Sequence, residues 1–191
     1  DLVTSLTSAE LKELNDELKG MATRTSTSTL RELAVQAGKL GIDGKRNILE
    51  FVKAADKIQM ALGEDLGQDT LISVGKLVNV FKLKEQFGIE QSMLKVASSI
   101  NSVGQASEAA EPHIVDFLNQ VGGTGDTVGI SIADLVGLAG ALDSVGLTAE
   151  VSATAFKDNI VEFVRDTEKW AKVAGYNVGE LSSILEKEGT N

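Results

Sequence analysis

Apolar residues recur along most of this chain at intervals of three and four, the spacing that gives an α-helix one apolar face. The segment ILEFVKAADKIQMALG, residues 48–63, shows this spacing clearly. Further helices are predicted over residues 7–20, 30–42, 69–81, 93–103, 111–121, 131–144, 148–173 and 177–188. No segment combines alternation of apolar and polar residues with the composition of a strand. The pattern therefore predicts an all-α fold without a β-sheet.

A second pattern marks the ends of these helices. An apolar residue, a glycine, another apolar residue and a residue able to begin a helix follow one another in LGID (40–43), FGIE (87–90), VGIS (128–131), VGLT (145–148) and AGYN (174–177). A glycine just past a helix end adopts the left-handed conformation, and the next apolar residue packs back on the last turn. We therefore predict tight corners with positive φ at Gly41, Gly88, Gly129 and Gly146, which join short helices into a compact domain.

Polar residues predict where two of the early helices start. Thr7 with Glu10, and Thr29 with Glu32, have the spacing of a capping box, in which each partner satisfies a free backbone N–H at the helix start. The Ser/Thr run over residues 23–29 precedes the second start and is interpreted as a flexible linker.

Small residues lie four apart in the helix predicted at residues 131–144. Ala133, Gly137 and Ala141 share one face, with Gly140 beside them, so another helix could approach closely along this ridge. A glycine inside a helix costs about 1 kcal/mol relative to alanine. We therefore predict that the ridge of Ala133, Gly137 and Ala141 packs against a neighbouring helix.

Composition agrees with a globular helical chain. Of its 191 residues, 42% are hydrophobic and 24% charged, with a single proline and no cysteine, so a disulfide framework is excluded. We predict three parts: an N-terminal helix and Ser/Thr linker at residues 1–29, a compact core at 30–160, and a C-terminal helical extension at 161–191. The helices in the two outer parts are expected to be more mobile than the core.

Negative charge is concentrated in the second half of the chain. Of the formal net charge of −10, residues 107–191 carry most, with 5 basic and 14 acidic side chains. An acidic surface repels nucleic-acid phosphates and anionic lipids, so we expect no stable nucleic-acid binding. The uncharged run at residues 135–142 is much shorter than the roughly 20 residues of a membrane span and is interpreted as a buried helix face.

Candidate chemistry is sparse. The segment GGTGDTVG, residues 122–129, is interpreted as a glycine-rich loop, and it lacks the lysine that follows the glycines of a phosphate-binding loop. His113 is the sole histidine, so His-based triads and multi-histidine metal sites are excluded. We expect its side chain to make a surface contact with Asp116. We predict no catalytic residue, no metal and no cofactor.

Two features near the C-terminus are given structural interpretations. The acidic residues Glu162, Asp166 and Glu168 are spaced to pair with Arg165, Lys169 and Lys172, which indicates a solvated helix face with ion pairs. Trp170, the only tryptophan, is interpreted as an anchor in a core or an interface.

Several segments in a fixed order resemble the core region of phage tail tape-measure proteins. They are LRELAVQAGKLGI (30–42), ILEFVKAADKIQMALG (48–63), ISVGKLVNVFKLKEQFGIEQSMLKVASSINSVGQASEAA (72–110), IVDFLNQVGG (114–123) and GISIADLVGLAGALDSVGL (129–147). The resemblance covers residues 30–160 and departs from the family at residues 81–87, where extra charged residues precede the Gly88 corner.

The resemblance implies a structural, non-enzymatic segment of a protein that lies in the tail lumen, sets tail length during assembly and is expelled at infection. It implies partners among the tail tube protein, tail assembly chaperones and tail-tip proteins, in the host cytoplasm during assembly and then in the virion. One alternative is a membrane-active helical module that inserts residues 129–147 during DNA passage, which vesicle leakage would reveal. A small-ligand-binding helical domain and a homo-oligomer also remain open.

Overall fold

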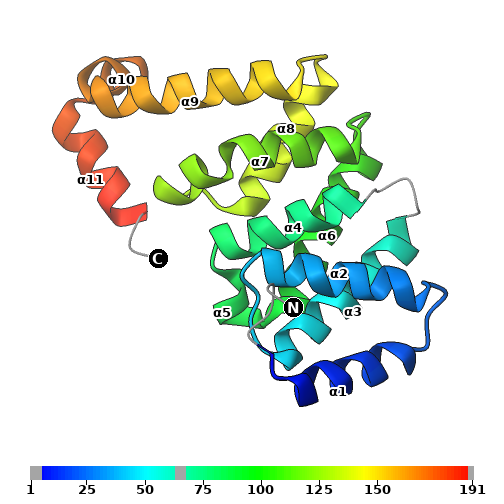
Figure 1. The fold of residues 1–191 in the computed structure, drawn as a ribbon. Helices are drawn as coiled ribbons and strands as arrows, with labels where there is room; N and C mark the ends of the chain where they lie inside the picture. The colour runs from blue at the N-terminus through cyan, green and yellow to red at the C-terminus, as the bar shows by residue number, and fades with distance from the viewer. Residues whose placement is uncertain (1–5, 63–67, 189–191) are drawn as a thin grey trace.

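The computed structural model describes residues 6–62 and 68–188. These residues form eleven α-helices and no strand, so the predicted all-α class is confirmed. In chain order the helices are α1 Ser8–Lys19, α2 Thr27–Lys39, α3 Lys45–Leu62, α4 Gln68–Val80, α5 Leu83–Phe87, α6 Ile89–Ala106, α7 Glu111–Thr127, α8 Ile132–Ser144, α9 Ala149–Arg165, α10 Thr167–Val173 and α11 Val178–Glu188 (Figure 1). The end predicted at residue 63 lies outside the described residues.

The start of α1 has the predicted capping box, but the start of α2 does not. The Thr7 hydroxyl accepts a hydrogen bond from the Glu10 N–H, and the Glu10 carboxylate accepts one from the Thr7 N–H at 2.8 Å. At α2 the N-cap is Ser26, whose hydroxyl accepts from the Thr29 N–H at 3.2 Å. The prediction of Thr29 as a cap is wrong because Ser26 supplies an acceptor one turn earlier and places Thr29 inside the helix.

The segment before α2 is held by a buried carboxylate, which corrects the prediction of a flexible linker at residues 23–29. The hydroxyls of Thr23 and Thr25 both donate to Oδ1 of Asp56, each at 2.6 Å. Asp56 is buried on α3, and hydrogen bonds to a charged acceptor are stronger than those between neutral groups. The Ser/Thr residues thus position the entry to α2.

Replacing Asp56 with alanine should lower the free energy of unfolding by about 1–3 kcal/mol, because both threonine hydroxyls would lose their acceptor. Asp56→Asn keeps one acceptor oxygen and should lose less. Urea unfolding followed by circular dichroism measures both variants. Equal stability of Asp56→Ala and the wild type would contradict the anchoring role.

One hydrophobic cluster runs from α1 to α9. Helix α3 packs against α2 and α6, and α7 packs against α4, α8 and α9. The largest side chains that are fully buried in this cluster include Leu33, Phe51, Met93 and Phe117. Leu14 and Leu18 of α1 belong to the same cluster, so the first helix is continuous with the packing of the following helices. The domain boundaries at residues 29 and 160 remain predictions.

The glycine corners have the predicted backbone conformation. The φ angles are 74° at Gly41, 73° at Gly88, 76° at Gly129 and 79° at Gly146. After Gly41, the N–H of Ile42 donates back to the Ala37 carbonyl at 3.0 Å, which is the bond of a Schellman motif. The Gly129 and Gly146 corners have the same backward bond.

Gly88 is a corner of another kind. It lies between α5 and α6, and its ψ of 169° is extended, so the chain turns without the Schellman bond. The charged residues before it form the short helix α5, which Lys82 begins with a φ of 51°. The stretch that departs from the tape-measure pattern is therefore where the corner geometry differs.

Replacing Gly41 with alanine should cost about 1–2 kcal/mol of unfolding free energy, because a side chain disfavours positive φ. A Cβ at Gly41 would meet no atom within 4 Å, so the cost is confined to the backbone. Gly20 has a φ of −82° and is the matched control: Gly20→Ala should leave stability unchanged or raise it slightly. Equal thermal midpoints for the two variants would contradict the corner model.

The glycine-rich segment at residues 122–129 is mostly helical, which corrects its prediction as a loop. Helix α7 continues to Thr127, and Gly122 and Gly125 lie where other helices approach it, whereas Gly123 faces open space. A Cβ on Gly122 would lie 3.2 Å from Leu77 of α4, and one on Gly125 would lie 2.6 Å from Leu135 of α8. These glycines are retained in the helix because they give room to the neighbouring leucines.

The single helix predicted over residues 148–173 is two helices. Asp166 breaks it with φ −135° and ψ 65°, and its side chain accepts a hydrogen bond from the Lys169 N–H at 3.0 Å. An aspartate that caps a new helix start competes with continuation of the old one. Helix α10 therefore leaves α9 in a new direction (Figure 1).

Candidate interaction surface

The small residues of α8 do not face a neighbouring helix of this chain. Ala133, Gly137 and Ala141 occupy exposed positions, and a Cβ on Gly137 would meet no atom within 4 Å. The predicted packing ridge is therefore wrong. The buried residues of α8 are Leu135, Val136, Ala139 and Gly140. Burying leucine and valine removes more apolar area from water than burying alanine, so the larger side chains face α6 and α7.

Gly140 is the glycine that permits close packing of α8. A Cβ at this position would overlap the Cγ1 methyl of Val103 on α6. Gly140 thus provides the close helix contact that the sequence pattern assigned to Gly137. The exposed face of α8 also includes Leu138, so it presents small and apolar groups to the solvent.

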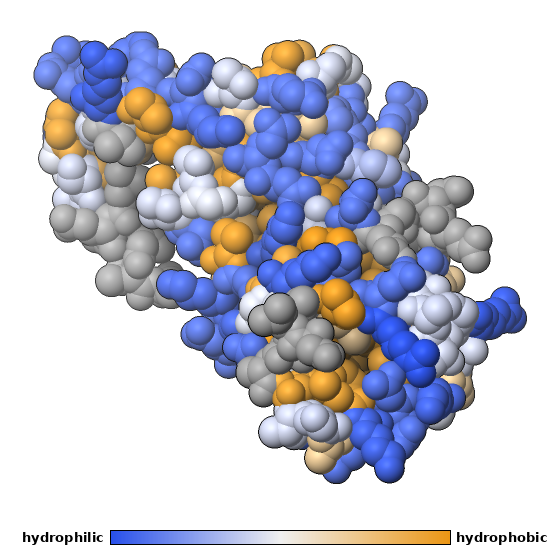
Figure 2. All heavy atoms as spheres, viewed as in Figure 1, coloured by the Kyte–Doolittle hydropathy of each residue, from blue (hydrophilic) through white to orange (hydrophobic). Residues whose placement is uncertain are grey.

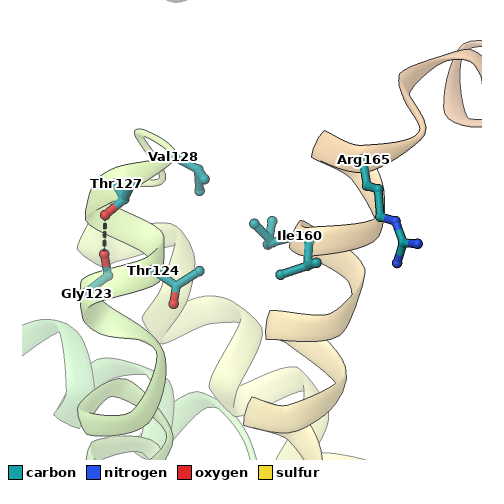
Figure 3. A pocket seen from close by; sticks show the side chains of 7 residues that line it. Gly123, Thr124, Thr127, Val128, Ile160 and Arg165 are labelled. Carbon is teal, nitrogen blue, oxygen red and sulfur yellow. Dashed lines mark hydrogen bonds between the residues drawn. The ribbon is translucent and has the colours of Figure 1, made fainter.

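An open groove lies between the C-terminal halves of α7 and α9. Its volume is about 630 Å³, and it is lined by Gly123, Thr124, Thr127, Val128, Ile160, Val161 and Arg165. Figure 3 shows Val128 and Ile160 pointing toward one another from the two helices. Thr127 turns its hydroxyl onto its own helix, where it donates to the Gly123 carbonyl at 2.8 Å. The groove thus presents mainly methyl groups.

The groove exists because α9 packs on α7 only along its first half. Ala149 and Ala153 are buried there, and the rings of Phe117 and Phe156 meet edge to face at 6.2 Å. Farther along α9, Val161 is 60% exposed. Among the described residues that line the groove, Arg165 is the only charged one, so no acid–base pair lies beside the hydroxyls of Thr124 and Thr127, and the arrangement suits an apolar segment.

His113 joins the start of α7 to the end of α8. Its Nδ1 pairs with Oδ1 of Asp143, while Oδ2 of Asp143 accepts from the Ala110 N–H at 3.0 Å. The expected contact with Asp116 is wrong because Asp143 lies closer across the helix pair. Because the Asp143 carboxylate also accepts a hydrogen bond from a backbone N–H at the start of α7, this contact has a structural role and stabilises the packing of α7 on α8.

The charged residues of α9 and α10 form the predicted ion pairs. Lys169 pairs with Glu162, and Lys172 pairs with Glu168 at 2.8 Å. The hydrogen bond to each glutamate raises the pKa of its lysine above the ordinary value. Both pairs are solvent-exposed, so they contribute little stability. Trp170 lies beside Phe163 with ring centroids 6.1 Å apart, where it anchors α10 to α9.

Within residues 6–62 and 68–188, no His, Cys, Asp or Glu side chains form a group of three or more that could hold a metal ion. Over the same described ranges, none of the helices has both the length and the apolar character needed to cross a membrane. Hydrophilic residues cover much of the face in Figure 2, and apolar residues appear as separate patches.

A comparison with protein families finds the model described as phage-related minor tail protein, which matches residues 15–175. The match covers most of the chain. This chain belongs to the phage-related minor tail protein family. Searches of curated proteins and of solved structures gave no match.

The family match covers most of the structural features of this chain. All four predicted corners and the α7–α9 groove fall within residues 15–175, whereas α11 lies beyond the matched range. Membership of this family assigns the chain a structural role in the phage tail. The resemblance to tail proteins noted in the sequence is confirmed at this level.

The α7–α9 groove was not predicted from the sequence. Its signal is the apolar set of α9, which continues past the residues that pack on α7 to Ile160 and Val161. An apolar face longer than its partner indicates an uncovered surface. The separation of α7 and α9 decides that this surface is a groove.

Proposed function

We propose that this chain is a segment of a tail tape-measure protein, acting without catalysis in tail assembly, tail-length determination and genome delivery. The order of the tape-measure-like segments between residues 30 and 147 carries the proposal. The family match over residues 15–175 supports the proposal at the level of a phage tail protein.

The proposed location is the lumen of the tail in the virion, and the host cytoplasm during assembly. The proposed partners are the tail tube protein, the tail assembly chaperones and the tail-tip proteins. The acidic half of the chain, with 14 acidic and 5 basic side chains over residues 107–191, suits a lumen through which DNA passes, because it repels the phosphate backbone and disfavours lasting contact.

Protease protection tests this location. Purified tails are treated with protease while intact and again after triggered DNA release, and the chain is detected with a specific antibody. We expect the chain to survive in intact tails and to be missing from tails that have released their DNA. A surface fibre protein, digested in the same intact sample, controls for protease activity. Digestion of the chain in intact tails would contradict a position in the lumen.

A further inference from the structure

Helix α1 lies at the edge of the body and is held by few contacts. Among the described residues it packs only on α2 and α3, and the packing of α3 on α6 and of α7 on α4, α8 and α9 does not involve it (Figure 1). Leu14 and Leu18, four residues apart, are its only buried side chains. A helix of 12 residues is marginal in water when isolated, so α1 depends on this surface for its helical form.

Polar contacts flank the two leucines. Nζ of Lys45, at the start of α3, donates to Oε2 of Glu13 at 2.8 Å and to Oε1 of Glu17 at 2.9 Å, and both hydrogen bonds raise the pKa of Lys45 above its ordinary value. On α2, Nε of Arg31 donates to Oδ1 of Asn15 at 2.7 Å. Both glutamates are exposed, so water and salt weaken their pairs with Lys45. These contacts therefore set the orientation of α1 and add little to its stability.

The chain is anchored directly after α1. Thr23 and Thr25 both donate to the buried Asp56, which fixes the entry to α2 independently of α1. Residues 20–22 join α1 to this anchor, and of these three only Met21 packs on the hydrophobic cluster, where it is partly buried. Helix α1 can therefore separate from α2 and α3 as one unit, through a local opening that leaves the other helices in place.

We propose that α1 is a displaceable cover over a helix-binding site on α2 and α3. A partner helix fits this site when it carries two leucines four residues apart, each preceded by a glutamate. Its leucines take the places of Leu14 and Leu18 in the hydrophobic cluster, and its glutamates take the places of those that pair with Lys45. Docking of an amphipathic helix by its apolar face is a common mode of recognition. The inference is independent of the tape-measure proposal, since it rests on the contacts of α1 alone.

Binding of a labelled peptide to the 191-residue chain tests this proposal. The peptide has the sequence of residues 6–22, and fluorescence anisotropy measures its affinity. Leu18→Asp places a charge at a buried position and should detach α1. This variant should bind the peptide at least about 10-fold more tightly than the wild type, in which α1 occupies the site for most of the time. Ala9→Asp, at an exposed position of α1, is the matched control and should bind as weakly as the wild type.

Two further changes test the chemistry of the partner helix. A peptide with aspartate in place of both Leu14 and Leu18 should not bind to the Leu18→Asp chain. Adding Lys45→Met to that chain should weaken binding of the unchanged peptide severalfold and reduce its dependence on salt, because the glutamates of the peptide lose their cation. Lys57→Met, which removes the exposed pair with Glu90 on the same helix, should leave peptide binding unchanged.

Hydrogen exchange of the wild type tests the opening without any substitution. The amides of α1 should exchange faster than those of α3 and α6. Equal protection would show that α1 opens only with the whole fold, and would overturn the proposal. A Leu18→Asp chain that loses the helical signal of the whole body, a folded Leu18→Asp chain that does not bind the peptide, or a wild type that binds it as tightly as Leu18→Asp would each overturn it as well.

Discussion

Replacing Gly140 with leucine should destabilise the fold by about 3 kcal/mol or more, which is the upper part of the range for overpacked cores. The Cβ alone would overlap the Cγ1 methyl of Val103, and the remaining leucine atoms would have to separate α8 from α6. Val103 cannot yield easily because a β-branched side chain has few alternative rotamers. Urea unfolding of the purified variant measures the loss.

The same substitution at Gly137 is the matched control. Gly137 lies on the exposed face of the same helix, with open space where a Cβ would be. Gly137→Leu should therefore keep the wild-type stability or raise it by up to about 1 kcal/mol, through better helix propensity. A loss at Gly137 that equals the loss at Gly140 would show that α8 packs with its other face inward.

The helices and corners were predictable because local chemistry determines them. Gly41 and Gly146 each follow an apolar helix end and precede an apolar residue that bonds back, a set of conditions contained within a few residues. The capping box at Thr7 is equally local. These features need no knowledge of which helix packs against which.

The glycines inside helices were misassigned because their role depends on distant partners. Leu135 leaves no room for a side chain at Gly125 of α7, and Val103 leaves none at Gly140 of α8. Neither contact can be inferred from the spacing of residues within one helix. A four-residue spacing of small residues defines one face of a helix. It does not show whether that face or a face with larger apolar residues packs against the rest of the protein.

The groove shows the same dependence on tertiary structure. Sequence spacing places Ile160 and Val161 on an apolar face, yet only the divergence of α9 from α7 leaves that face uncovered. The break at Asp166 likewise decides that α10 starts a new helix instead of extending α9.

Deleting residues 30–160 in frame from the parent protein should abolish tail assembly or genome delivery. The longest helices of the described residues have 18 residues, about 27 Å each, and they fold against one another. The same segment in one continuous helix would span about 200 Å. A segment folded in this way adds little to the length of a tape-measure protein. Its deletion should therefore remove a structural function and should not shorten the tail in proportion to the missing residues.

Two point variants separate loss of the fold from loss of length, since neither changes the number of residues. In the parent phage, Gly137→Leu should leave tails and infectivity normal. Gly140→Leu should reduce the yield of complete particles, because overpacking at the α6–α8 contact destabilises the folded segment. Normal yields from a Gly140→Leu phage whose purified segment is unfolded would contradict a role for the folded body.

Electron microscopy of particles from the deletion phage tests the central claim most directly, through the distribution of tail lengths beside that of the wild type. We predict that complete, infectious particles are absent, and that no population of functional tails appears at a reduced length. Infectious virions whose tails are uniformly shorter by about 200 Å, the helical length of the missing residues, would contradict the account and show that the segment itself is the ruler.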